Sequence, residues 1–88
     1  MVDRKMIDIP GMRQLASRFR NEASTVEQVI STMNSLVTNL DATYRSDTAE
    51  QFKQKYEGEL KPNFQKAKEE IESIAQFLDN EANRYENM

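Results

Sequence analysis

The chain has 88 residues, which is enough for one small domain. It contains no cysteine and no histidine, so disulfide bonds, Cys/His zinc sites and catalysis by a thiol or an imidazole are excluded. Lys and Arg number 12 against 15 Asp and Glu, which gives a net charge of −3. A nucleic-acid-binding domain of this size carries a basic surplus, so that class is disfavoured as well.

The N-terminal segment carries charges without an apolar run behind them, so we expect no secretory signal peptide. No window of the chain approaches the roughly 18 consecutive apolar residues that a membrane span needs, and we expect no membrane-spanning helix. If such a chain leaves the cell, it does so without a cleaved signal.

A first helix is predicted from about residue 9 to residue 40. Asp8 can cap its N-terminus, and Pro10 suits a first turn, where its missing N–H costs nothing. From Phe19 to Leu40 the apolar residues follow one another in alternating steps of four and three, which is the heptad spacing of helices that pack along their length. Residues on one flank make this stripe wider than one neighbouring helix can cover, namely Leu15, Val29 and Leu36.

A polar turn is predicted over residues 41–47, where the apolar stripe stops and helix-capping residues cluster. Either Ser46 or Asp47 can cap the helix that follows, and Asp47 with Glu50 three residues later has the spacing of a capping box. Two helices joined by so short a turn fold back on each other in antiparallel orientation.

A second helix is predicted over about residues 48–86. From Phe52 to Phe64 its apolar residues step by four each time, a stutter that locally unwinds a supercoil. Pro62 lies in this stretch, where it removes one helical hydrogen bond and crowds the carbonyl group of Gly58. Because the apolar spacing continues on both sides, we expect a kink near Pro62 in a continuing helix; a third helix that begins there is the alternative.

The predicted fold is therefore all-α, with residues 1–88 as a single domain that forms an antiparallel helical hairpin. A hairpin has only one internal interface, and ordering each residue costs about 1.5 kcal/mol. The wide stripe should therefore pair with a second hairpin and complete a four-helix bundle. The residues predicted to meet the partner are Leu15, Phe19, Val26, Val29, Met33, Leu36, Phe52 and Tyr56.

The titratable groups offer little for catalysis. Acidic and basic residues recur at i, i+4 spacing, as in Glu57 and Lys61, which indicates ion pairs along a solvated helix face. Arg13, Arg18 and Arg20 would serve an anionic substrate only if they pointed inward, as the cationic side chains of small helical chorismate mutases do, but they flank the stripe. We predict no enzyme, no catalytic or metal-binding residue and no cofactor, with a mutase-like enzyme and a generic coiled-coil adaptor as distant alternatives.

The loop and the residues after it carry a family resemblance. Tyr44-Arg45-Ser46 joins the two helices, Phe52 follows Tyr44 by eight residues, and Tyr56 follows Phe52 by four. This pattern resembles the Trp-x-Gly (WXG), ESAT-like proteins of type VII secretion systems, in which a Trp-x-Gly turn joins two helices and Phe and Tyr follow at those offsets. The resemblance extends over roughly residues 6 to 86 and implies that Tyr44, Arg45 and Ser46 form the turn.

The chain departs from the family pattern at the turn and near the C-terminus. Tyr44 replaces the Trp with an aromatic ring that can pack across the helix ends, and Ser46 replaces the Gly with a capping residue that lacks glycine's freedom at positive φ. The family's export signal is a Tyr followed four residues later by Asp or Glu. Tyr85 corresponds to that Tyr, but the acid would stand at position 89, so we expect only a remnant of the signal.

The resemblance implies a non-enzymatic protein of Gram-positive bacteria that leaves the cytoplasm through an ATPase-driven membrane machine, without a signal peptide, and becomes secreted or surface-bound. The implied partner is an identical or related hairpin, or the helical N-terminal domain of a larger secreted protein; no nucleic acid is implied. The missing acid after Tyr85 favours a targeting chaperone for a larger effector of the LXG type. Autonomous export as a homodimer is the close alternative.

Overall fold

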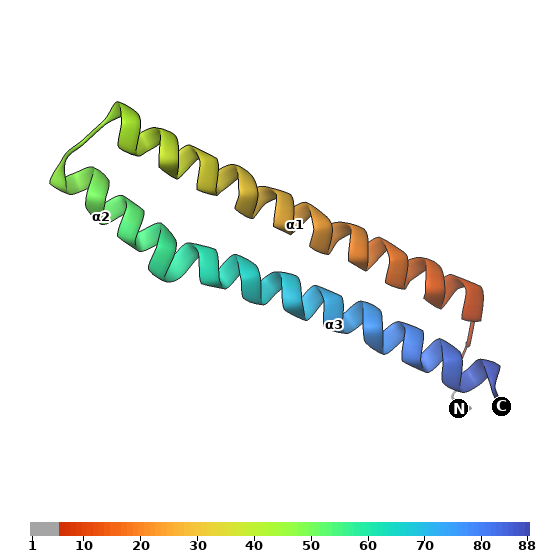
Figure 1. The fold of residues 1–88 in the computed structure, drawn as a ribbon. Helices are drawn as coiled ribbons and strands as arrows, with labels where there is room; N and C mark the ends of the chain where they lie inside the picture. The colour runs from red at the N-terminus through yellow and green to blue at the C-terminus, as the bar shows by residue number, and fades with distance from the viewer. Residues whose placement is uncertain (1–5) are drawn as a thin grey trace.

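The computed structural model describes residues 6–88, so the charged segment Met1–Lys5 of the predicted domain lies outside the described residues. The elements in chain order are α1 (Ile9–Thr43), α2 (Asp47–Lys55), the π-helix η1 (Tyr56–Leu60) and α3 (Lys61–Glu86). In Figure 1, α2, η1 and α3 run on from one another as a single rod, which lies antiparallel to α1. The predicted all-helical hairpin is thus confirmed, and a four-helix bundle would require a second hairpin.

The N-terminus of α1 is capped as predicted. Asp8 Oδ1 accepts a hydrogen bond from the backbone N–H of Gly11 at 3.0 Å, and Pro10 lies in the first turn. A Cβ atom at position 11 would lie too close to the Asp8 carboxylate, so a larger residue there would require the capping side chain to move.

The C-terminus of α1 lies three residues beyond the predicted end at residue 40. The helix continues to Thr43, so the connection covers only residues 44–46 and the predicted turn over 41–47 is too long. The polar residues before the turn are compatible with the last helical turn because their side chains find partners nearby. The Thr43 hydroxyl donates to the Asn39 carbonyl oxygen at 2.8 Å, and Asp41 pairs with a lysine of α2.

The irregularity predicted at Pro62 lies just before it and is a π-helix. The backbone N–H of Lys61 donates to the carbonyl oxygen of Tyr56, five residues earlier, and Pro62 enters the first turn of α3. A proline ring normally collides with the carbonyl group four residues back, and the wider π turn provides a way to accommodate it. The steps of four from Phe52 to Phe64 are the sequence trace of this wider turn.

The seam between α1 and the second rod is built largely from small side chains. Four buried residues of α1 recur every seven positions: Ala16, Ala23, Ile30 and Val37. Ala75 and Ala82 of α3 are also buried, and alanines on both helices let the backbones approach closely. Tyr56 is the largest of the buried side chains. The hairpin therefore has a thin core and leaves its larger apolar side chains to other surfaces.

The π-helix also resets the direction in which the second rod faces. Ala49 and Tyr56 are buried and lie seven residues apart, a spacing that would bring Phe77, three heptads after Tyr56, against α1. Instead, Ala75 and Ala82 face the seam and Phe77 is 61% exposed. One extra residue in the helical turn accounts for this rotation.

Replacing Gly58 with alanine is expected to stabilise the hairpin. Gly58 lies in η1 without a positive φ, and no atom lies within 4 Å of the position that its Cβ would take. Glycine in a helix interior costs about 0.5–1 kcal/mol relative to alanine. We expect a gain of this size in the free energy of unfolding, seen as a higher urea midpoint at unchanged slope. A loss of stability would indicate that the π-helix requires glycine at this position.

Candidate partner interface

One edge of the hairpin, the polar edge, is a ladder of cross-helix polar contacts. Its α1 members are spaced by seven residues, and each meets a residue of the second rod: Arg13 with Glu86 and Asn83, Arg20 with Asp79 at 2.6 Å, Glu27 with Lys68 at 2.8 Å, Asn34 with the Tyr56 hydroxyl at 2.8 Å, and Asp41 with Lys53 at 2.7 Å. Sequence inspection missed this ladder, although the seven-residue spacing on α1 was available as a signal.

The polar edge specifies the register of the hairpin more than it stabilises the hairpin. Exposed ion pairs contribute only about 0–1 kcal/mol each. A slip of one rung in either direction, however, brings like charges together, because either Arg20 meets Lys68 or Glu27 meets Asp79. These contacts raise the pKa of two lysines: a hydrogen bond to Asp41 raises the pKa of Lys53, and a hydrogen bond to Glu27 raises the pKa of Lys68.

The opposite side of α1 is apolar. On α1, a polar-edge residue lies three positions before each buried seam residue from Ala16 to Val37, and an apolar residue lies three positions after it. Arg20, Ala23 and Val26 form one such set. At 100° per residue, these two neighbours lie on opposite sides of the seam residue. The polar edge and the apolar stripe therefore occupy opposite sides of the hairpin.

The apolar face, as we name this side, extends over both rods. Large side chains on it are exposed by the following fractions: Leu15 46%, Val29 40%, Leu36 55%, Phe52 66%, Leu60 40% and Ile74 43%. Half-buried members continue it along the seam, namely Phe19, Val26, Met33, Leu40, Phe64, Ile71 and Leu78. Soluble monomers rarely expose large contiguous apolar patches, so this face is the candidate partner interface.

Seven of the eight residues predicted to meet a partner lie on this face, and their role in binding stays a prediction. Tyr56 is the exception, because it is only 2% exposed and lies inside the hairpin. Its hydroxyl donates to Asn34 Oδ1 and lies 3.4 Å from the Ile30 carbonyl oxygen. Tyr56 therefore anchors the second rod to α1 and offers almost no surface to another chain.

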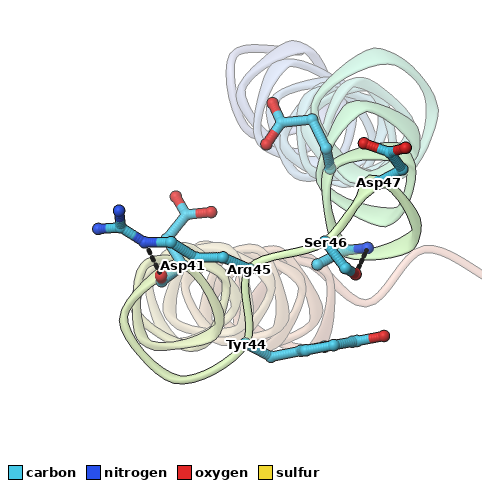
Figure 2. Close-up of a pocket in the computed structure, with 7 residues that line it drawn as sticks. Asp41, Tyr44, Arg45, Ser46 and Asp47 are labelled. Atoms are coloured by element: carbon cyan, nitrogen blue, oxygen red, sulfur yellow. Dashed lines mark hydrogen bonds between the residues drawn. The ribbon is translucent and has the colours of Figure 1, made fainter.

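The turn is extended at Tyr44 and Ser46 and needs no glycine. Tyr44 and Ser46 have φ angles of −143° and −164°, so Ser46 fits where the family pattern has Gly. Figure 2 shows the Arg45 guanidinium bent back toward α1, where its Nε donates to the Asp41 carbonyl oxygen at 3.2 Å. Figure 2 also shows the Tyr44 side chain directed away from this contact. Tyr44 is 51% exposed and lines a depression with Leu40 of α1 and Ala49 and Phe52 of α2, and its packing across the helix ends stays a prediction.

Ser46, and not Asp47, caps the second rod. Its Oγ accepts from the backbone N–H of Ala49 at 3.1 Å, while Asp47 and Glu50 lie in the first turn of α2, where their charges suit the helix dipole. The hollow around this turn has a volume of about 540 Å³ and is lined mainly by polar residues, including Asp41, Asp47 and Glu50. It therefore differs in chemistry from the apolar face.

Substituting Ser46 with alanine should destabilise the protein by about 1 kcal/mol, because the first turn of α2 loses its side-chain acceptor. The matched control is Ser35→Ala in the middle of α1, where the serine is exposed and bonds only to the Ser31 carbonyl oxygen of its own helix. Urea unfolding monitored by circular dichroism measures both. Equal midpoints for the two variants would contradict the capping role.

The arginines considered for an anionic site are dispersed. Arg20 is held by Asp79 and Arg13 by Glu86 and Asn83 on the polar edge, while Arg18 is exposed. The seam beside them is closed by Ala16 and Ala23. These cations are not grouped around a cavity, which removes the geometric basis for the mutase alternative.

Tyr85, predicted as the export-signal remnant, lies half-buried in the last turn of α3. The Arg84 guanidinium lies over its ring at 4.6 Å and donates to its hydroxyl oxygen at 3.0 Å. Its role in export stays a prediction. Within residues 6–88, neither rod has an apolar stretch of the length and hydropathy that spanning a membrane requires.

The shape of the molecule exposes more surface than a chain of this mass normally does. The accessible surface is 7029 Å², and the radius of gyration is 19.7 Å. For 10.3 kDa the usual values are about 5,400 Å² and about 12 Å. The excess of about 1,700 Å² is twice what one partner contributes to an interface of standard size.

A thin alanine seam, one polar edge and one long apolar face define a helical hairpin of the kind that pairs with other helices. The family comparison agrees with this class: residues 5–88 match the family described as proteins of 100 residues with WXG, and the chain belongs to this WXG100 family. The resemblance inferred from the loop is thereby confirmed. WXG100 proteins are exported by type VII secretion without a signal peptide.

Among solved structures, the chain is similar to EsxA of Geobacillus thermodenitrificans in its crystal form I. The two share 25% sequence identity, the match covers 99% of this chain and 92% of the EsxA chain, and the TM-score is 0.85. A comparison with curated protein sequences found no match. The family pattern therefore holds over the full hairpin even though Tyr44 and Ser46 replace the Trp and Gly that give the family its name.

Proposed function

We propose that this chain is a non-enzymatic type VII secretion protein that acts by pairing its apolar face with a second helical hairpin. The observation that carries the proposal is the apolar face itself, which runs along both rods on the side opposite the polar edge. Pairing two such faces gives a four-helix bundle with the apolar side chains inside and the ion pairs outside. The folded bundle is the form presented to the secretion machinery.

The partner that the charges favour is a second copy of the chain. From Gln28 to Leu40, α1 carries no charged residue, whereas its N-terminal half carries Arg18 and Glu22 on or near the apolar side. An antiparallel second copy sets the charged half of each α1 against the uncharged half of the other. No like charges then meet along the seam, which supports autonomous export as a homodimer.

A targeting role is the second candidate, in which the helical N-terminal domain of a larger LXG-type effector replaces the second copy. The observation that favours it is Phe77, which is 61% exposed on the flank of α3, outside the α1 stripe. A partner larger than a second hairpin could cover Phe77 as well. Both roles use the apolar face, and the position of the family's export acid, 89, is not part of this sequence. The two roles are therefore distinguished by the partner with which the hairpin pairs.

Two measurements test the proposal. Light scattering of the purified chain, alone and after co-expression with the protein encoded next to it, should give twice the chain mass of 10.3 kDa in the first case. A monomer alone and a stable complex after co-expression would favour the targeting role. Export from the native host should stop when the secretion ATPase is deleted; export that continues without the ATPase would overturn the proposed function.

A further inference from the structure

A hollow of about 330 Å³, the face hollow, opens in the apolar face where α1 meets η1. Its lining is mixed. The apolar part comes from both rods and consists of Met33, Val37, Phe52, Tyr56 and Leu60. The polar part comes from the second rod alone, and its members are all exposed: Lys55, Glu59 and Asn63. The hollow is therefore apolar on one side and in contact with water on the other.

Met33 is the lining residue that carries a chemically reactive atom, its thioether sulfur. The chain has five methionines and no cysteine, so methionine supplies all of its sulfur. Met6 and Met88 are 86% and 87% exposed at the ends of the hairpin. Met12 is half-buried near the start of α1. Met33 is also half-buried, but it borders a space large enough to admit a small solute from the solvent.

A hydroperoxide is the class of reagent that reacts with a thioether in such a position. The sulfur lone pair attacks one peroxide oxygen, so an S–O bond forms and the O–O bond breaks. The departing oxygen takes up the proton of the transferred hydroxyl group and, for hydrogen peroxide, leaves as water. The sulfur is oxidised by two electrons, and the peroxide is reduced by two. The product, methionine sulfoxide, is polar where the thioether was apolar.

The mixed lining lets a single hairpin tolerate this change. The Lys55 ammonium group and the Asn63 side-chain amide are hydrogen-bond donors in the lining of the same hollow, and water reaches its polar side. A partner that lies on the apolar face excludes this water and places the sulfoxide oxygen among apolar side chains. A buried polar group without a hydrogen-bond partner is unfavourable, so the oxidised residue opposes pairing more than it opposes folding.

We propose that Met33 is an oxidation site through which a hydroperoxide separates the hairpin from a second copy of the chain. This inference rests on the proposed pairing function but does not depend on the register or orientation of the pair. Pairing covers the face hollow, so the reaction takes place on unpaired chains and prevents them from pairing again. The chain thereby carries a redox-sensitive switch although it has no cysteine.

The test compares the purified chain before and after treatment with dilute hydrogen peroxide. Peptide mass mapping identifies chains that carry one added oxygen on Met33, and light scattering over a concentration series gives the dimer dissociation constant. Oxidation of Met33 should raise this constant at least about tenfold, with the helix content by circular dichroism unchanged. Reduction by methionine sulfoxide reductase with a dithiol should restore the original constant.

Two leucine variants assign the effect to one sulfur atom. Met33→Leu should form dimers as the unmodified chain does and should lose the response to peroxide, because leucine keeps the apolar volume without the sulfur. Met12→Leu, the matched control on the same helix, should keep the response. Met33→Gln places a polar amide at the same position and should raise the dissociation constant without any peroxide.

The outcomes separate the switch from the pairing function. An unchanged dissociation constant in chains oxidised at Met33 would overturn the switch while the pairing function stands. A response to peroxide that persists in Met33→Leu would overturn the assignment to Met33. Loss of helix content on oxidation would contradict the tolerance of the single hairpin, and a monomeric mass before oxidation would overturn self-pairing together with the switch.

Discussion

Replacing Val26 with glutamate is expected to convert a dimeric chain into a monomer of 10.3 kDa without loss of helix content. Val26 lies half-buried in the middle of the apolar face, so a bundle would enclose the new carboxylate without a partner. Removing an unpaired charge from water costs about 3 kcal/mol or more, and each 1.4 kcal/mol is a factor of ten in affinity. The dissociation constant should therefore rise by about a hundredfold or more, which light scattering over a concentration series measures.

The matched control for this change is Gln28→Glu. It adds the same charge two residues away, at an exposed position on the outward side of α1, and should leave the dimer mass unchanged. If Val26→Glu remains as dimeric as Gln28→Glu, the apolar face is not the pairing surface, and the proposed function loses the observation on which it depends.

Tyr56→Ala is expected to unfold the hairpin rather than to separate a pair. The ring is the largest of the buried side chains, and its hydroxyl joins the second rod to Asn34 of α1. Truncating a buried aromatic residue costs about 3–5 kcal/mol, which is a large part of the total stability of a small domain with so thin a core. Thermal unfolding followed by circular dichroism, at one fixed protein concentration, should show a strongly lowered midpoint or no cooperative transition.

The conservative variant Tyr56→Phe separates the ring from its hydroxyl. It keeps the packing and removes only the hydrogen bond to Asn34, so the loss should be about 1 kcal/mol. If Tyr56→Ala cost no more than Tyr56→Phe, the ring would contribute little to the core.

The two sides of α1 contribute differently: the polar edge contacts the second rod within one chain, and the apolar face is the proposed binding surface. The polar edge fixes how the two rods align within one chain, because a one-rung slip opposes Arg20 and Lys68 or Glu27 and Asp79. The seam of small residues holds the rods close, and the larger side chains remain on the apolar face. A charge introduced on the apolar face should therefore affect pairing alone, whereas a change at Tyr56 affects the fold on which pairing depends.

Heptad spacing and capping chemistry were sufficient to predict the hairpin. The alternating steps from Phe19 to Leu40 predicted α1 as an amphipathic helix. Asp8 marked the start of α1, and the pair Ser46 and Asp47 marked the start of the second helix, with the structure choosing Ser46 as the cap. The four-residue spacing of the apolar residues around Pro62 predicted an irregular turn in the second helix. These features are local in sequence, so periodicity and side-chain chemistry are enough to read them.

Tertiary structure alone decided which apolar residues become core. Spacing placed Tyr56 and Phe52 in the same stripe, yet Tyr56 is buried and Phe52 is 66% exposed, because Tyr56 lies seven residues after the buried Ala49 and continues its inward direction, whereas Phe52 lies on the flank of that line. The cross-helix partners of Arg20 and Asp41 likewise depend on register, which joins residues far apart along the chain. Periodicity gives the direction of a side chain around its own helix; what it meets depends on how the second helix is rotated and aligned.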